Sequence, residues 1–250
     1  MKKQSPAQNA GGAKSRREKA DAMKNRIFAA ILVVAALLLP TLVIADEIEY
    51  VTFGSYEQDN DLTNGKEPIE WRVLKEEDGE AMLLSRYALD TQPYNQGRGN
   101  NIHWPECTLR AWLNNEFYNE AFSEEEQALI ILKTLKNYKE IDTEDRVFLL
   151  DNFEARSLFA NHADRQTSPT AYAKSKGCYM SKKYIGNVHW WLRSFSWESS
   201  RRASYVAASG GVMTCGGSSE ADGAVENARW TVRPVICIRS EDLEKLRGAE

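Results

Sequence analysis

The stretch IEWRVLKEEDGEAMLLS, residues 69–85, decides how the chain begins to fold. Ile69, Trp71 and Val73 alternate with polar residues, so their side chains share one face of a strand. A second apolar run, 81–85, follows the charged segment 75–79, which ends in glycine. Two such runs joined by a short polar segment predict a β-hairpin.

Two helical patterns come next. The segment 109–117 carries leucine, tryptophan and phenylalanine at steps of three and four residues, and Thr108 is in place to cap that helix. Ser123 and Glu126 have the spacing of a capping box, which predicts a second helix running to about Leu132. Two consecutive helices are therefore expected after the hairpin.

Strands dominate the rest of the chain. The run 147–150 predicts a short buried strand, and Asn152 can cap a helix whose apolar face includes Phe153 and Phe159. Residues 168–169, Ser-Pro, open another helix that Gly177 ends. Short β runs follow at 190–193, 204–208, 212–215 and 230–239, with glycines 210 and 211 as a hairpin turn. This order predicts an α+β fold, a single domain with an antiparallel β core and several peripheral helices.

The N-terminal part of the chain has a different composition. Residues 1–26 hold eight basic and two acidic side chains, a net charge of +6, and no apolar periodicity, which predicts a disordered tail. A charge-free apolar run, 27–45, would span about 28 Å as a helix, close to the thickness of a hydrocarbon core. Because basic flanks stay in the cytoplasm, residues 46–250 are predicted to be extracytoplasmic.

Two interpretations of the run 27–45 stay open. As one N-terminal hydrophobic helix it would anchor the protein in the cell membrane, a single-pass span with a cytoplasmic N-terminus. As the apolar part of a signal peptide, its helix would end at Pro40 and cleavage after Ala45 would secrete a domain beginning at Asp46. Both interpretations export the domain 46–250.

Charge and cysteine content narrow the classes of partner. The whole chain has a net charge of −4, so the part beyond residue 26 carries −10, which argues against nucleic-acid binding. No metal-ligand motif or cofactor-binding loop is present, and the oxygen-rich segment 59–65 predicts a polar turn; we expect no metal and no cofactor. The four cysteines permit either two disulfides outside the cytoplasm or four buried thiols: Cys107, Cys178, Cys215 and Cys237.

The densest group of side chains suited to ligand binding is HWWLRS, residues 189–194, followed by Trp197. Adjacent tryptophans on a strand point to opposite faces, so one ring is expected in the core and the other is free to stack on a ligand. Hydrogen-bonding side chains follow in loops rich in glycine and serine. The predicted ligand-binding residues are Trp191, Arg193, Trp197, Arg201, Arg202, Asn227 and Arg229.

The sequence contains no assembled catalytic motif, so no catalytic residue is predicted and the protein is expected not to be an enzyme. One alternative centres on Cys215, with His189 upstream and Arg229 and Arg233 downstream. This set loosely resembles the thiol, imidazole and guanidinium groups of sortase transpeptidases, in which a neighbouring cation would lower the pKa of the thiol.

Several phrases taken together resemble the domain-of-unknown-function family 6273. They include FGSY at 53–56, IEWRVL at 69–74, TLRAWLN at 108–114, PTAYA at 169–173, WWLRS at 190–194 and VRP at 232–234. The resemblance covers residues 53–238 and implies an extracytoplasmic or membrane-tethered bacterial protein. The last two phrases more distantly resemble the C-type-lectin-like core of formylglycine-generating enzymes and variable ligand-binding domains, which implies binding through the loops between the final strands. The close cysteine pair of the oxidases has no counterpart here.

The leading hypothesis is thus an extracytoplasmic, membrane-tethered, non-catalytic domain that recognises a glycan or a protein at the bacterial cell surface. Its expected partners are the membrane, through residues 27–45, and that ligand. Two alternatives remain: a thiol-dependent cell-wall enzyme using Cys215, and a structural envelope protein.

Overall fold

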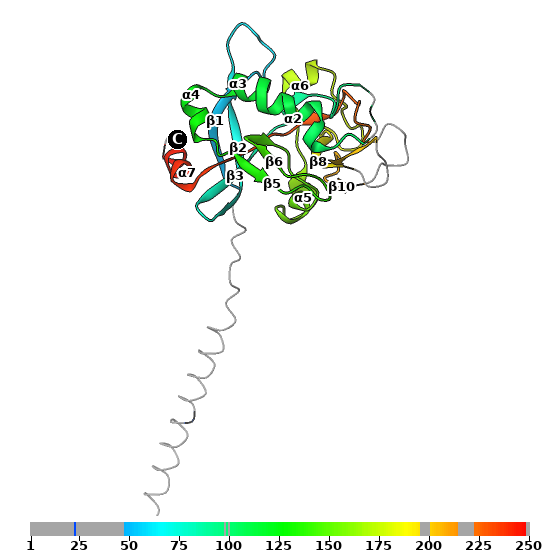
Figure 1. Ribbon diagram of the computed structural model, residues 1–250. Coiled ribbons are helices and arrows are strands. Elements are labelled where there is room, and N and C mark those ends of the chain that lie inside the picture. The colour runs from blue at the N-terminus through cyan, green and yellow to red at the C-terminus, as the bar shows by residue number, and fades with distance from the viewer. Residues whose placement is uncertain are drawn as a thin grey trace, which may run out of the picture. The chain divides into compact units, whose positions relative to one another are not determined.

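The computed structural model describes residues 23, 48–97, 99, 101–195, 201–214 and 223–248. Within it, Ile48–Glu250 forms one compact unit of mixed α+β structure built on two five-stranded sheets (Figure 1). The apolar run 27–45 lies outside the described residues, as do Trp197 and Cys215. Among the residues that are described, no helix has the length and apolar character needed to cross a bilayer.

The first sheet has the order β1-β2-β3-β12-β7 and is antiparallel throughout. The predicted hairpin is confirmed, although its turn is shorter than expected. Asp78 and Gly79 alone connect the two strands, and both have positive φ angles, 55° and 78°, as a two-residue type I′ turn requires. The strands are β1 (Tyr50–Tyr56), β2 (Glu67–Glu77), β3 (Glu80–Ser85), β7 (Val147–Phe148) and β12 (Val235–Arg239).

The second sheet has the order β10-β9-β8-β11-β4, and its only parallel pair among the described strands joins β11 to β8. Its strands are β4 (Asp90–Thr91), β8 (Trp190–Phe195), β9 (Ala203–Val206), β10 (Val212–Met213) and β11 (Thr231–Val232). The predicted turn between β9 and β10 is present. At its Gly210, φ is +83° and a Cβ atom would lie 1.6 Å from the carbonyl oxygen of His162, so only glycine fits.

The predicted run 230–239 is divided between the two sheets. β11 ends at Val232 and β12 begins at Val235, so Arg233 and Pro234 form the crossing. Proline has no N–H to donate and cannot continue a central ladder, which explains the break. Arg233 is thereby held between the two sheets. A separate hairpin, β5 (Lys133–Leu135) with β6 (Thr143–Asp145), carries the loop 136–142.

The helices are short and follow the sequence patterns with small shifts. One helical segment runs through α2 (Thr108–Trp112), the π-helical turn η2 (Leu113–Phe117) and α3 (Tyr118–Ala121), and it buries leucines 109 and 113 as predicted. Its cap is Cys107 rather than Thr108, because the Cys107 Sγ accepts from the N–H of Arg110. The remaining helices are η1 (Trp104–Glu106), α4 (Glu124–Leu129), α5 (Glu154–Ser157), η3 (Ala163–Arg165), α6 (Ala171–Ser175) and α7 (Ser240–Arg247).

Three of these helices test the predicted caps. The capping box before α4 is confirmed, with Ser123 and Glu126 each accepting from the other's N–H, but α4 stops at Leu129. The cap before α5 is Asp151 rather than Asn152, since its Oδ1 accepts two backbone N–H groups. Helix α6 begins after Thr170 and not at residues 168–169, because the Thr170 hydroxyl caps it.

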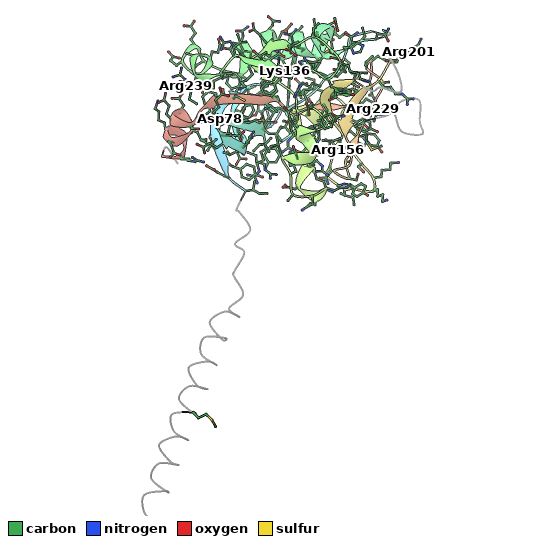
Figure 2. The ribbon with its side chains drawn as sticks, turned by 60° about the horizontal axis from the view of Figure 1, so that its bottom comes forward. Asp78, Lys136, Arg156, Arg201, Arg229 and Arg239 are labelled. Atoms are coloured by element: carbon green, nitrogen blue, oxygen red, sulfur yellow. The ribbon has the colours of Figure 1, made fainter. Side chains whose placement is uncertain are left out.

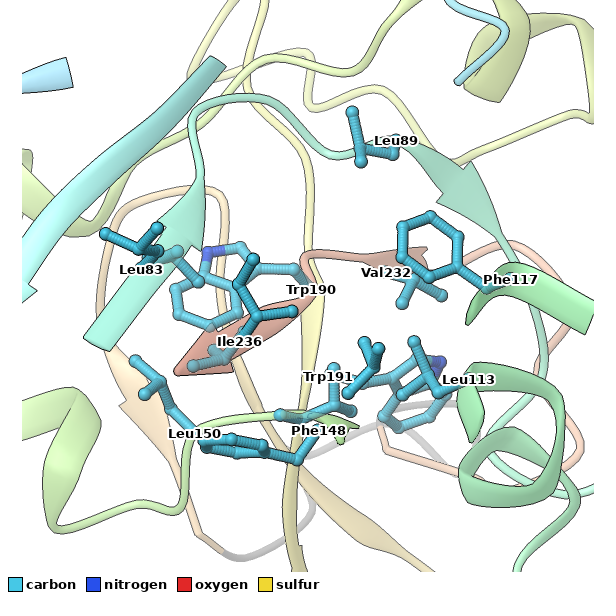
Figure 3. Close-up of a cluster of buried hydrophobic side chains, with 14 of the residues drawn as sticks. Leu83, Leu89, Leu113, Phe117, Phe148, Leu150, Trp190, Trp191, Val232 and Ile236 are labelled. Carbon is cyan, nitrogen blue, oxygen red and sulfur yellow. The ribbon is translucent and has the colours of Figure 1, made fainter. Parts of the chain in front are cut away.

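The core contains both tryptophans at the start of β8. Trp190 and Trp191 are each completely buried, and Figure 3 shows them in one cluster of apolar side chains with Leu113 and Ile236. The expectation that one ring would be free is therefore wrong for this pair. Both faces of β8 are covered, and each indole N–H finds a backbone carbonyl, on Arg165 and Gln92 respectively.

The described cysteines are reduced and buried. Cys107, Cys178 and Cys237 form no disulfide, in agreement with the interpretation of these residues as small buried side chains. Burial raises the pKa of the Cys107 and Cys237 thiols to about 12, so both are poor nucleophiles.

Candidate functional site

A hollow of about 360 Å³ opens where the ends of β8 and β10 meet the loop 136–140, the turn 151–153 and helix α5. We call it the aromatic pocket. It is of the size that small ligands occupy, and its lining combines aromatic, amide and charged side chains. The lining residues are Lys136, Asn137, Tyr138, Glu140, Asp151, Asn152, Phe153, Arg156, Arg193, Ser194, Phe195 and Thr214.

Two exposed aromatic rings stand at this pocket. Tyr138 is 60% exposed and Phe153 is 64% exposed, and their ring centroids lie 6.4 Å apart in an edge-to-face arrangement. Large aromatic rings are usually buried, so two adjacent exposed rings make this surface a candidate binding surface. Such rings can stack on the flat face of a sugar or on a peptide side chain.

The floor of the pocket is a buried arginine. Arg193, in β8, is only 4% exposed, and its Nη1 and Nη2 donate to Glu154 Oε2 at 2.5 Å and to Asp151 Oδ2 at 3.0 Å. Nη1 also donates to the carbonyl of Leu149, and Nε alone lacks a partner among the described residues. Two carboxylates therefore compensate the single guanidinium charge, and no further anion is needed there.

The same contacts position Phe153. Asp151, which pairs with Arg193, also accepts from the N–H groups of Phe153 and Glu154 at 2.8 and 2.7 Å. Glu154 in turn accepts from the N–H of Asp151. The turn that carries the exposed ring is thus tied to the buried arginine, which gives the aromatic surface a rigid support.

Two carboxyl groups in the pocket have perturbed pKa values. Burial, with the negative charge of Glu154, raises the pKa of Asp151 even though Arg193 opposes the shift. Burial also raises the pKa of Glu140, although its Oε1 lies 2.6 Å from the Nδ1 of His103. Raised carboxyl pKa values in a hollow are typical of ligand sites, where such groups meet hydroxyl and amide groups of a ligand.

The predicted site residues are only partly brought together. Arg193 lines the aromatic pocket, but Trp191 is completely buried, with its ring 4.5 Å from that of Trp230, so its placement on a binding rim is wrong. Trp197 lies outside the described residues.

The other four predicted residues lie on described parts of the chain, and none of them lines the aromatic pocket. The side chain of Asn227 accepts from the N–H of Arg229, and the Arg229 guanidinium lies 5.7 Å from the ring of Tyr179. Arg201 and Arg202 precede β9, and the backbone of Arg202 forms an isolated β-bridge with that of Ala224. Arg201 and Arg229 lie toward the same side of the view in Figure 2.

Sequence reasoning missed the two exposed rings. Phe153 was assigned to the apolar face of a helix, yet it precedes α5 and points outward, whereas Ala155 and Phe159 are buried. Two signals were available. Tyr138 is an aromatic residue within the otherwise polar segment 136–140, and Asp151 with Glu154 has the spacing of a helix cap, which places residue 153 in the first turn.

One acidic cluster has the composition of a cation site. Carboxylate oxygens of Glu57, Asp59 and Glu67 lie within 4.8 Å of one another. Hydrogen bonds already engage them: Glu57 accepts from the N–H of Asn60, and Glu67 from that of Gln58. These bonds organise a polar turn, as predicted for the segment 59–65, and we assign the cluster no ligand.

The structure is thus an α+β domain with two largely antiparallel sheets and a pocket lined in part by aromatic side chains. The chain belongs to the family described as "Domain of unknown function (DUF6273)", which matches residues 78–240. The match confirms the predicted family and begins at the turn of the first hairpin, later than expected. No curated protein and no solved structure matches the chain, so the C-type-lectin-like resemblance stays a prediction.

Proposed function

We propose that this protein is a non-catalytic binding protein whose aromatic pocket recognises a glycan at the bacterial cell surface. The main support for this proposal is the pair of exposed rings, Tyr138 and Phe153, beside the Arg193 guanidinium, whose charge is already compensated. An uncharged sugar ring offers an apolar face for the aromatic rings and hydroxyl groups for neighbouring polar side chains. Asn137, Asn152 and Ser194 supply such polar groups.

The location of the domain is part of this proposal. The basic tail 1–26 and the apolar run 27–45 support a cytoplasmic N-terminus and an exported domain. Intact-mass measurement of the mature protein distinguishes the two routes of export. A full-length mass supports the membrane anchor, whereas a product beginning at Asp46 supports a cleaved signal.

The proposal is tested by screening the full chain, in detergent, against a panel of glycans and peptidoglycan fragments, with peptides as a second panel. We expect Tyr138→Ala and Phe153→Ala each to weaken glycan binding about tenfold, because each removes one stacking face. Both variants should keep the free energy of unfolding within about 0.5 kcal/mol of the wild type, since both rings are exposed.

The matched control is Ile185→Ala, which removes a side chain that is 90% exposed and does not line the pocket. This variant should bind like the wild type. Wild-type binding to peptides alone would replace the glycan with a protein ligand. Glycan binding that is equal in all four proteins would place the ligand elsewhere and overturn the assignment of the aromatic pocket.

A further inference from the structure

A second hollow, of about 340 Å³, lies on the unit Ile48–Glu250 and is lined by three arginines. We call it the arginine pocket. Its lining includes Arg72 from β2, Arg86 from the segment after β3, and Arg233 from the crossing between the sheets, together with Tyr50, Asp164 and Ser168. None of these residues lines the aromatic pocket.

Arg233 is the unusual member of this set. It is 3% exposed, and its Nε and Nη2 donate to the backbone carbonyls of Ser85 and Arg86 at 2.7 and 3.2 Å. Its guanidinium lies 5.3 Å from the centre of the Trp190 ring. Its Nη1 is buried and has no hydrogen-bond partner among the described residues, and no carboxylate among them hydrogen-bonds to the guanidinium.

The one nearby carboxylate is already engaged by another arginine. Asp164 accepts from Nη1 and Nη2 of Arg72 at 2.6 and 3.0 Å. The Nε of Arg72 is also buried without a partner among the described residues. Asp164 is therefore paired with the partly buried Arg72 and leaves the buried Arg233 without a carboxylate partner among the described residues, while Arg86 is paired separately with Glu70 at 2.8 Å. The pocket keeps one uncompensated positive charge.

This arrangement of charges shifts the pKa values of both Arg233 and Asp164. Burial, with the positive charge of Arg72, lowers the pKa of Arg233 to about 9, which leaves it protonated at neutral pH. Burial by itself would raise the pKa of Asp164, but hydrogen bonds from Arg72 and from the Ala160 N–H lower it. A buried cation without a counterion is unfavourable, and a bound anion would relieve that penalty.

We propose that the arginine pocket binds the phosphate group of a small or lipid ligand through Arg233, beside the Arg72–Asp164 ion pair. Guanidinium groups suit phosphate because several N–H donors meet several acceptor oxygens. Hydroxyl donors for the remaining oxygens are present on Tyr50 and Ser168. The bidentate pair with Arg72 neutralises Asp164, so that carboxylate does not repel the ligand.

Two sources of such a phosphate are chemically equivalent at this pocket. Inorganic phosphate or a soluble phosphate monoester is one source. A phospholipid headgroup is the other, because Ile48 lines the pocket and follows the apolar run 27–45 by only three residues in the sequence. The inference does not depend on the glycan proposal, since it concerns different residues.

The test measures thermal unfolding of the full chain, in a phosphate-free detergent, while inorganic phosphate replaces chloride at constant ionic strength. We expect a saturable rise in the unfolding temperature, because a ligand that binds only the folded state stabilises it. Ser168→Asp should raise the phosphate concentration for half-maximal stabilisation about tenfold, since a carboxylate would then face the anion. Ser168 is exposed, so this substitution leaves the core intact.

Ser168→Asn is the matched control, with the same shape as aspartate and no charge, and it should keep most of the effect because its amide N–H can replace the serine hydroxyl as a donor. A general salt effect of phosphate would act equally on all three proteins, and that outcome would overturn the proposal, as would the absence of saturation in the wild type. Arg233→Gln, if folded by circular dichroism, should lose the effect. A parallel titration with dihexanoyl phosphatidic acid identifies the source: tighter binding than inorganic phosphate indicates a lipid headgroup, and weaker binding indicates a soluble phosphate.

Discussion

Arg193 and Arg233 are both almost completely buried, and both border a pocket, yet they are compensated differently. Arg193 donates to two carboxylates, Asp151 and Glu154, whereas Arg233 donates to two backbone carbonyls. The same strand serves both, because β8 carries Arg193 and its Trp190 ring packs against Arg233. The comparison shows that the burial of an arginine does not by itself indicate which kind of ligand suits the pocket beside it.

The charge around each guanidinium makes the difference. In the aromatic pocket the charge of Arg193 is balanced by two carboxylates, and exposed rings are available for contact, which suits an uncharged ligand. The arginine pocket has surplus positive charge, which suits an anion. Three predictions test this contrast, beginning with strand β8, which carries Arg193 and packs against Arg233 through Trp190.

The largest effect is expected from Trp191→Ala, which removes a completely buried ring and its hydrogen bond to the Gln92 carbonyl. Replacing a core tryptophan by alanine lowers the free energy of unfolding by about 3–5 kcal/mol. Urea denaturation of this variant beside Tyr138→Ala, which removes an exposed ring, measures the effect. A loss below about 1 kcal/mol in Trp191→Ala would show that the ring is not part of the core, and Trp191 would again be a candidate ligand-binding residue.

A smaller difference should separate the two arginines. Arg193→Met leaves two partly exposed carboxylates without their cation, which should lower the free energy of unfolding by about 2–3 kcal/mol. Arg233→Met leaves no carboxylate unpaired and removes an uncompensated charge, so a loss of about 1 kcal/mol is expected. Urea denaturation in phosphate-free buffer gives both values. Equal losses would show that the two guanidinium groups are equally well compensated.

The smallest effect concerns the titration of one aspartate in each pocket. Asp151 has a pKa raised above its usual 3.8, so the folded protein binds this proton more tightly than the unfolded chain does. The contribution of Asp151 to stability therefore falls as the pH rises from 3.8 through the pKa of the folded state. Asp164 has a lowered pKa, so its contribution is present above pH 3.8 and is lost as the pH falls through its folded pKa. Carboxyl ¹³C NMR titration should place the two pKa values on opposite sides of 3.8. The reverse order would contradict the charge assignment of the pockets.

Several elements could be predicted because neighbouring residues decide them. The capping box at Ser123 and Glu126 and the hairpin at Asp78 and Gly79 depend on contacts within four residues. The helical stripe that begins at Leu109 is equally local. Small shifts occurred where two candidate caps stand side by side, as at Cys107 and Thr108, and only the fold selected one of them.

The candidate site could be predicted only in part. Arg193 was identified from its place beside the tryptophans, but the partners that compensate it lie 42 and 39 residues earlier in the sequence. Nothing in the local pattern of HWWLRS indicates that both faces of strand β8 are covered. The exposure of Phe153 likewise follows from where α5 begins.

The sequence by itself determined the α+β class, the family and the main strand and helix signals, because periodicity, caps and turns are properties of adjacent residues. The tertiary structure alone decided which aromatic rings are exposed and which arginines are compensated. The physical reason is that burial and charge pairing depend on elements that are distant along the chain. Arg233 meets carbonyl groups of Ser85 and Arg86 almost 150 positions away, and the side chains that surround it determine whether its charge is satisfied.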